Sequence, residues 1–168
     1  MTDRRLAFLD IAKSAGWATS NGRADVLFGV KEFPRGQLAT TGQVFRLYRQ
    51  WLSDFIAIHN PTDLAFEAPM FAGNAGEVAY LLIGMAAITE EFCNERGIPC
   101  YQQTPDEIRK HLLGFARGND IKSHVGFKLR QLGYDVADHN AADALAGLIY
   151  MQDCFLPETA AILAGTAQ

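Results

Sequence analysis

The chain has 168 residues, of which 49% are hydrophobic and 20% are charged, with a net charge of −4 and a pI near 5.5. This composition excludes an intrinsically disordered chain, and the length fits one domain, residues 1–168. No uncharged stretch approaches the roughly 20 residues that cross a bilayer, so we expect no membrane partner. Three cysteines without CxxC or Cys/His metal spacing favour a reducing, cytoplasmic compartment. The acidic charge argues at first sight against a nucleic-acid partner.

The N-terminal part of the chain is patterned as strands. Apolar runs of strand length occupy residues 5–11, 16–20 and 24–30. Asn21 and Gly22 lie between the second and third runs and suit the positive-φ positions of a tight hairpin turn. These features predict a three-stranded antiparallel meander.

Helices and strands alternate in the rest of the chain. Two further strands are expected at 62–66 and 98–102. Apolar spacing of i, i+3, i+4, together with cap residues and terminal Pro or Gly, predicts helices at 44–56, from Asn74 to about 96, and at 104–113, 122–132 and 140–154. This order predicts an α/β fold in which helices flank a mixed five-stranded sheet. The second helix is apolar all round over 78–88, which indicates burial or packing on another subunit.

Three acidic residues fall where this architecture brings elements together. Asp10 ends the first strand, Glu67 ends the fourth, and Asp143 lies near the start of the last helix. Each could be an ordinary polar residue at the end of an element, but Asp10 and Glu67 follow strands that look buried, where an unpaired acid is costly. Converging carboxylates repel one another unless a hard divalent cation neutralises them. The pattern therefore predicts a Mg²⁺ or Mn²⁺ site, with room for two ions acting on a phosphodiester.

The residues around these acids also carry a family resemblance. The sequence resembles the RuvC-like Holliday-junction resolvases of the ribonuclease H-like superfamily, in family order and over about residues 6–150. The matching segments are FLDIAKSAGWATS, LAFEAPMFAGNAGEVAYLLIGMAA, EIRKHLLGFARGNDIKSHVGFKL and HNAADALAGLIY. The resemblance implies a ribonuclease H-like fold, a homodimer, and an endonuclease that resolves four-way DNA junctions by paired nicks.

The resemblance also implies roles for individual residues. Asp10, Glu67 and Asp143 would be metal ligands. The family usually has a fourth ligand, Asp or His, three residues before the last Asp, and here that position is Asn140. His139, four residues before Asp143 on the same helical face, could substitute as ligand or as proton carrier. The fourth ligand could therefore be His139, Asn140 or neither of them.

The positive charge is concentrated in two segments despite the acidic total. Residues 109–130 carry six Lys or Arg against one acid, and residues 35–50 carry three Arg and no acid. Either could be a solvated surface, but such segregation is typical of a protein with one phosphate-facing side. The resemblance places Arg109 and Lys122 beside the scissile phosphate, with Lys122 in the catalytic set. The expected DNA-binding residues are Arg109, Lys110, Arg117, Lys122, Lys128 and Phe71. Phe71 would stack on a base at the branch point, although a core role fits it equally well.

Alternative functions remain at this stage. Another ribonuclease H-like nuclease could act on forks, flaps or RNA–DNA hybrids, because substrate choice depends on surface shape. A non-catalytic branched-DNA-binding protein with a decayed metal site is favoured by the neutral Asn140. An actin-like phosphotransferase is remote, since the chain has no Gly-rich phosphate loop.

Overall fold

A mixed five-stranded sheet forms the centre of the computed structural model, which describes residues 4–34, 39–69 and 76–156. The strands are β1 (Arg5–Asp10), β2 (Ser14–Asn21), β3 (Ala24–Glu32), β4 (Asp63–Glu67) and β5 (Cys100–Gln103), and their order is β3-β2-β1-β4-β5. β1, β2 and β3 form an antiparallel meander, while β1 pairs with β4 and β4 with β5 in parallel. The predicted meander and mixed sheet are confirmed.

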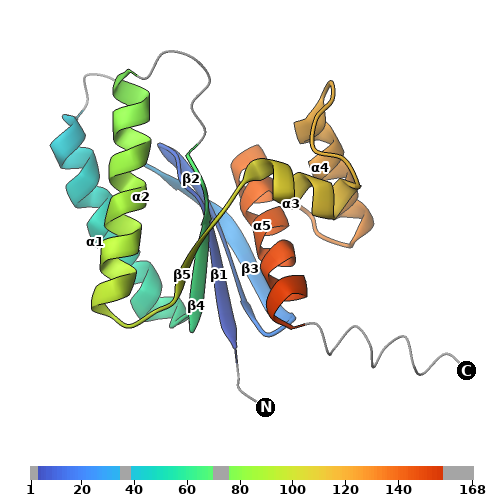
Figure 1. Ribbon diagram of the computed structural model, residues 1–168, viewed down its shortest axis with the longest axis horizontal. Coiled ribbons are helices and arrows are strands. Elements are labelled where there is room, and N and C mark those ends of the chain that lie inside the picture. Colours follow the sequence, from blue (N-terminus) through green and yellow to red (C-terminus); the bar gives the residue numbers. More distant parts are fainter. Residues whose placement is uncertain (1–3, 35–38, 70–75, 157–168) are drawn as a thin grey trace, which may run out of the picture.

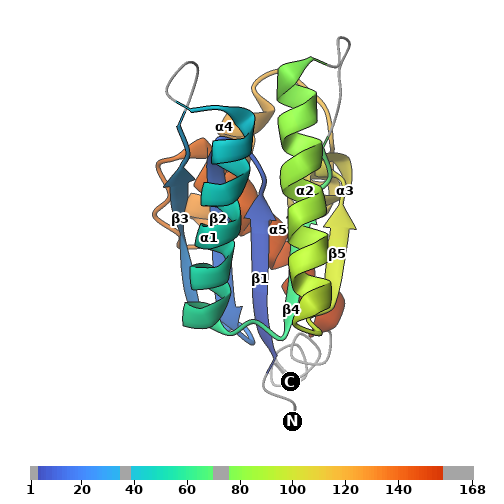
Figure 2. The same ribbon diagram turned by 90° about the vertical axis from the view of Figure 1, so that its left-hand side faces the viewer.

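Two helical layers cover the sheet (Figures 1 and 2). The described residues form α1 (Thr41–His59), α2 (Glu77–Glu95), α3 (Pro105–Leu113), α4 (Ile121–Gln131) and α5 (His139–Phe155). α1 and α2 pack on one face around a core that includes Tyr48, Leu52 and Met85. α3, α4 and α5 pack on the other face. No helix within the described ranges is long and apolar enough to cross a membrane.

Local sequence signals define several helix ends. Thr40 and Gln43 form a capping box that begins α1, and Thr104 and Glu107 form the same reciprocal pair at α3. The expected Asn74 cap of α2 is wrong, because the extended residue before that helix is Gly76, which makes no side-chain cap bond. Asn74 itself lies outside the described residues. The helix therefore begins later than the Asn-to-Glu spacing indicated.

α2 buries only one of its apolar faces. Leu81 and Met85 are buried in the core, whereas Val78, Tyr80 and Ile83 are 66%, 65% and 52% exposed. Of the two interpretations of this apolar helix, burial on all sides is thus wrong. Apolar side chains therefore remain exposed in the first two turns of α2, as expected where a surface contacts a second molecule.

Candidate active site

Two of the predicted acids lie side by side because two parallel strands end together. Asp10 is the last residue of β1, and Glu67 is the last residue of β4. Leu9 and Phe66, the residues immediately before them, are paired in the parallel register of these strands. The carboxyl ends of neighbouring parallel strands meet at one edge of a sheet, so both carboxylates are delivered to that edge.

The third acid is brought to this edge by close packing of α5 across the sheet. Gly16 of β2 pairs with Asp10, and a Cβ at position 16 would overlap the backbone carbonyl of Asn140 at the start of α5. Further along the helix, a Cβ at position 147 would overlap the ring of Phe8. These two glycines let α5 lie directly on β1 and β2, which places Asp143 over the strand ends. Neither was predicted as a site residue, although a glycine within a strand is a known signal of close backbone approach.

The start of α5 is held by its own cap. The Asp138 carboxylate accepts hydrogen bonds from the backbone N–H groups of Asn140 at 2.7 Å and Ala141 at 3.1 Å. Asp143 lies one turn further along and is only 9% exposed. A buried acid in the second turn of a well-fixed helix has a defined position, which is what a catalytic carboxylate requires.

The electrostatics of the three acids show that they share one environment. Burial, reinforced by the charges of Glu67 and Asp143, raises the pKa of Asp10 from 3.8 to about 8. Burial and the charge of Asp143 raise the pKa of Glu67 to about 7. Burial also raises the pKa of Asp143, against the opposing effect of nearby cations. Ionisation of all three carboxyl groups is therefore unfavourable in this site, and an added cation would stabilise the ionised forms.

Two predicted cations face these acids from separate helices. Lys122, in the first turn of α4, places its Nζ 3.6 Å from Oδ2 of Asp143. Arg109 of α3 is near enough to lower the pKa values of Asp10, Glu67 and Asp143. The structure thus brings both residues to the acids, as expected of groups that meet phosphate oxygens beside them.

The donor set suits a hard divalent cation. Carboxylate oxygens are the ligands that Mg²⁺ and Mn²⁺ prefer, and these carboxylates are short of positive charge. The described residues contain no group of three or more His, Cys, Asp or Glu already spaced to hold a metal ion. The three acids are close enough to act on one another's pKa values, but they do not form a closed ligand cage. His139 is exposed and lowers the pKa of Asp143, while Asn140 is half-buried, so both remain candidates for the fourth ligand.

The other predicted DNA-binding residues are spread over the α3–α4 side of the molecule. Lys110 is exposed on α3. Arg117 is exposed on the connection to α4, and its Nη2 lies 2.8 Å from Oδ2 of Asp106. Phe71 lies outside the described residues, so its predicted stacking role stays a prediction.

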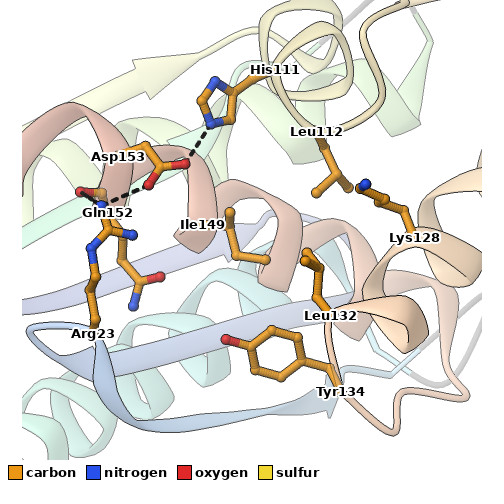
Figure 3. A pocket seen from close by; sticks show the side chains of 9 residues that line it. All are labelled: Arg23, His111, Leu112, Lys128, Leu132, Tyr134, Ile149, Gln152 and Asp153. Atoms are coloured by element: carbon orange, nitrogen blue, oxygen red, sulfur yellow. Dashed lines mark hydrogen bonds and ion pairs between the residues drawn. The ribbon is translucent and has the colours of Figure 1, made fainter. Parts of the chain in front are cut away.

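Lys128 lines a pocket on the same side of the sheet (Figure 3). The pocket has a volume of about 370 Å³ and contains Asp153, which is paired with Arg23 at 2.7 Å and with His111 at 2.8 Å. Its α5 residues are in the C-terminal half of that helix, six to ten residues or about 9 to 15 Å of helix from Asp143. Lys128 is thus placed away from the acids, unlike Lys122.

Comparisons of sequence point to one group of proteins. No family model matches the chain. Two curated relatives named crossover junction endodeoxyribonuclease RuvC match it, at 34% identity over 98 residues for Salinibacter ruber and 28% over 96 residues for Allorhizobium ampelinum. Each match covers 56% of this chain, and 53% and 56% of the two relatives, so the matched segment spans about half of their length.

Comparisons of structure extend over more of the chain. Thermus thermophilus RuvC is similar at a TM-score of 0.68 and 18% identity, covering 93% of this chain and 96% of that one. The same protein in complex with a Holliday junction substrate is similar at 0.73 and 16% identity, covering 94% and 96%. The yeast mitochondrial Holliday junction resolvase Ydc2 gives 0.57 and 12% identity, covering 86% and 75%. The chain has a ribonuclease H-like fold, and its resemblance to the RuvC-like resolvases is confirmed.

Proposed function

We propose that this protein is a divalent-metal-dependent endonuclease that resolves branched DNA, above all four-way junctions, by paired nicks. The observation that carries the proposal is the meeting of Asp10, Glu67 and Asp143 at one sheet edge, faced by Lys122 and Arg109. Buried carboxylates with raised pKa values are poised for divalent cations, and adjacent cations suit a phosphodiester. The names of the two sequence relatives, and the junction bound to Thermus RuvC, favour branched DNA as the substrate.

Each residue of the site has a separate role in hydrolysis. Asp10, Glu67 and Asp143 would hold one or two Mg²⁺ or Mn²⁺ ions, with His139 or Asn140 completing the set. A metal ion held by these residues would lower the pKa of the attacking water and neutralise charge at the leaving 3′-oxygen. Lys122 and Arg109 bind the phosphate oxygens and orient the scissile bond. His139, if it is not a ligand, carries a proton to or from the solvent. The products are 5′-phosphate and 3′-hydroxyl ends.

Paired nicking requires two copies of the site. Two symmetric cuts across a junction need active sites related by a two-fold axis, so we propose a homodimer. The exposed apolar side chains Val78, Tyr80 and Ile83 of α2 offer a contact surface. A single domain over 1–168 and a cytoplasmic location, in keeping with free Cys93, Cys100 and Cys154, belong to the same proposal.

A cleavage assay on several substrates tests this function. Purified protein with Mg²⁺ is incubated with a four-way junction, a fork, a flap and an RNA–DNA hybrid. Asp10→Asn and Glu67→Gln should abolish nicking while retaining junction binding in Ca²⁺. Strong cleavage of the hybrid with none of the junction would overturn the substrate, and unchanged nicking by both variants would overturn the metal site. Junction binding by the parent protein without any nicking would favour a non-catalytic binding protein.

A further inference from the structure

Three aromatic rings form an exposed cluster on the α3–α4 side of the molecule. Phe115 follows the C-terminal cap of α3 and is 43% exposed, and Phe127 of α4 is 57% exposed. Between them, the ring of His124 meets that of Phe115 edge to face, with centroids 5.7 Å apart at 82°. His124 and Phe127 are three residues apart on one helix, so their side chains are neighbours. We call these three residues the aromatic platform.

The platform is not part of the hydrophobic core. The core-facing side of α4 is occupied by Val125 and Leu129, which are 1% and 0% exposed. Phe127 lies between them in sequence and projects from the opposite side of the helix, since two residues of helix rotate a side chain by about 200°. Large apolar rings held in water without packing in the core mark a surface that binds something.

One ring of the platform is fixed in orientation. The Nδ1 atom of His124 lies 3.0 Å from the backbone carbonyl oxygen of Asp120. A carbonyl oxygen only accepts, so Nδ1–H is the donor of this bond. The bond and the edge-to-face contact with Phe115 together hold the imidazole ring in place. A planar surface that is already positioned loses little side-chain entropy when a flat ligand stacks on it.

Basic residues of α4 precede and follow the platform residues of this helix. Lys122 precedes His124 by two residues, and its Nζ lies 3.6 Å from Asp143. At 1.5 Å of rise and 100° of rotation per residue, His124 and Phe127 lie about 3 and 7.5 Å along α4 from Lys122 and about 200° and 140° around it, so the platform and the Lys122–Asp143 contact lie on different sides of this helix. Arg130 is the exposed residue three positions beyond Phe127. A flat apolar surface with Arg130 beside it suits a ligand that combines a planar ring with a phosphate group.

We propose that the aromatic platform of Phe115, His124 and Phe127 stacks on an unpaired base of branched DNA. This proposal rests on the proposed function and assigns these residues a part in choosing branched substrates. Bases inside a duplex are covered by their neighbours, so the platform can stack only where a base is open. The platform therefore favours branch points over continuous duplex.

A binding experiment in Ca²⁺ tests the proposal on the full chain. The probes are a four-way junction and a fork, each with 2-aminopurine at the branch point, and a fully paired duplex of equal length. Replacing both phenylalanines, Phe115→Leu with Phe127→Leu, should raise the Kd for the branched probes at least about fivefold and leave the duplex Kd unchanged. The quenching of 2-aminopurine on binding should be lost in parallel. The single Phe127→Leu variant should show a smaller loss in the same direction.

Two controls separate stacking from general surface effects. Phe127→Tyr keeps the ring and should retain parental affinity and quenching. Ile58→Ala removes another exposed apolar side chain, at the end of α1 on the opposite face of the sheet, and should change nothing. The proposal is overturned if the double variant binds branched DNA as the parent does, if the duplex loses as much affinity, or if Phe127→Tyr also loses it. A parent protein that neither binds nor nicks any branched probe would instead overturn the proposed function.

Discussion

Replacing Asp10 by Asn should change how the stability of the protein depends on pH. The pKa of Asp10 is raised from 3.8 to about 8 by burial and by Glu67 and Asp143. A carboxyl whose pKa is raised in the folded state binds its proton more tightly there than in the unfolded chain. The free energy of unfolding of the metal-free protein therefore falls as pH rises between about 4 and 8. Asn carries no charge, so the substitution removes this contribution.

The size of the effect follows from the shift. A displacement of about four pH units, at 1.36 kcal/mol per unit, sets an upper limit of about 5 to 6 kcal/mol above pH 8. Local relaxation and water entry reduce such penalties, so we expect a gain of roughly 1 to 3 kcal/mol for Asp10→Asn at pH 8. For a chain of this size that corresponds to a rise in Tm of roughly 3 to 10 °C. At pH 4 the two proteins should melt together.

Thermal unfolding in EDTA at pH 4, 6 and 8 measures the difference, with Asp54→Asn, an exposed acid on α1, as the matched control. Adding Mn²⁺ at pH 8 should raise the Tm of the parent protein and of Asp54→Asn by several degrees, and that of Asp10→Asn by much less. A Tm difference between parent and Asp10→Asn that does not grow with pH would refute the reasoning. So would equal stabilisation of all three proteins by Mn²⁺.

Three further predictions concern the arrangement around the site. Lys122→Gln removes the cation paired with Asp143, so it should lower kcat/KM for junction nicking by 10-fold or more and reduce the salt dependence of binding by about one phosphate contact. Single-turnover assays over a range of KCl concentrations measure both effects, and an unchanged rate and slope would contradict them. Gly16→Ala should cost about 1 to 3 kcal/mol of stability and most of the nicking activity, because the new methyl group overlaps the Asn140 carbonyl and displaces α5. Denaturant unfolding and nicking assays measure these losses. A fully active, equally stable variant would show that α5 is not held as described. Tyr80→Glu should convert the proposed dimer into a monomer that nicks one strand at a time. Light scattering measures the oligomeric state, and cleavage of a plasmid cruciform shows whether the two nicks are paired. A parent protein that is monomeric at working concentration would contradict this prediction.

Much of the fold is encoded locally. The capping boxes at Thr40 and Thr104 satisfy backbone N–H groups within four residues of sequence. Gly22 adopts a φ of 58° in the turn that joins β2 and β3, as its sequence indicates, whereas Asn21 ends β2 without a positive φ. Element type and order follow from such short-range signals and from apolar periodicity. The start of α2 does not, because Gly76 makes no side-chain bond that a sequence pattern would reveal.

The candidate site was predictable in its members but not in its assembly. Asp10 and Glu67 could be identified because each ends a strand with buried neighbours, and Asp143 because it lies near the start of the last helix. The resemblance added Lys122. The net charge of −4 does not argue against DNA binding, because basic residues are concentrated on α3 and α4 and the acids of the site contribute to the negative total. The raised pKa values of the acids depend on burial and mutual distance, which no single segment specifies.

The sequence by itself thus determined the strands, most helix ends and the residue types of the site, since these depend on interactions between residues close along the chain. Only the tertiary structure decided how α5 lies on the sheet. That placement depends on the absence of side chains at Gly16 and Gly147, each in contact with a residue more than 100 positions away. It also decided that Phe115, His124 and Phe127 stay exposed to water, because Val125 and Leu129 already fill the core side of α4. Close packing between distant segments is set by shape in three dimensions, and linear patterns do not record it.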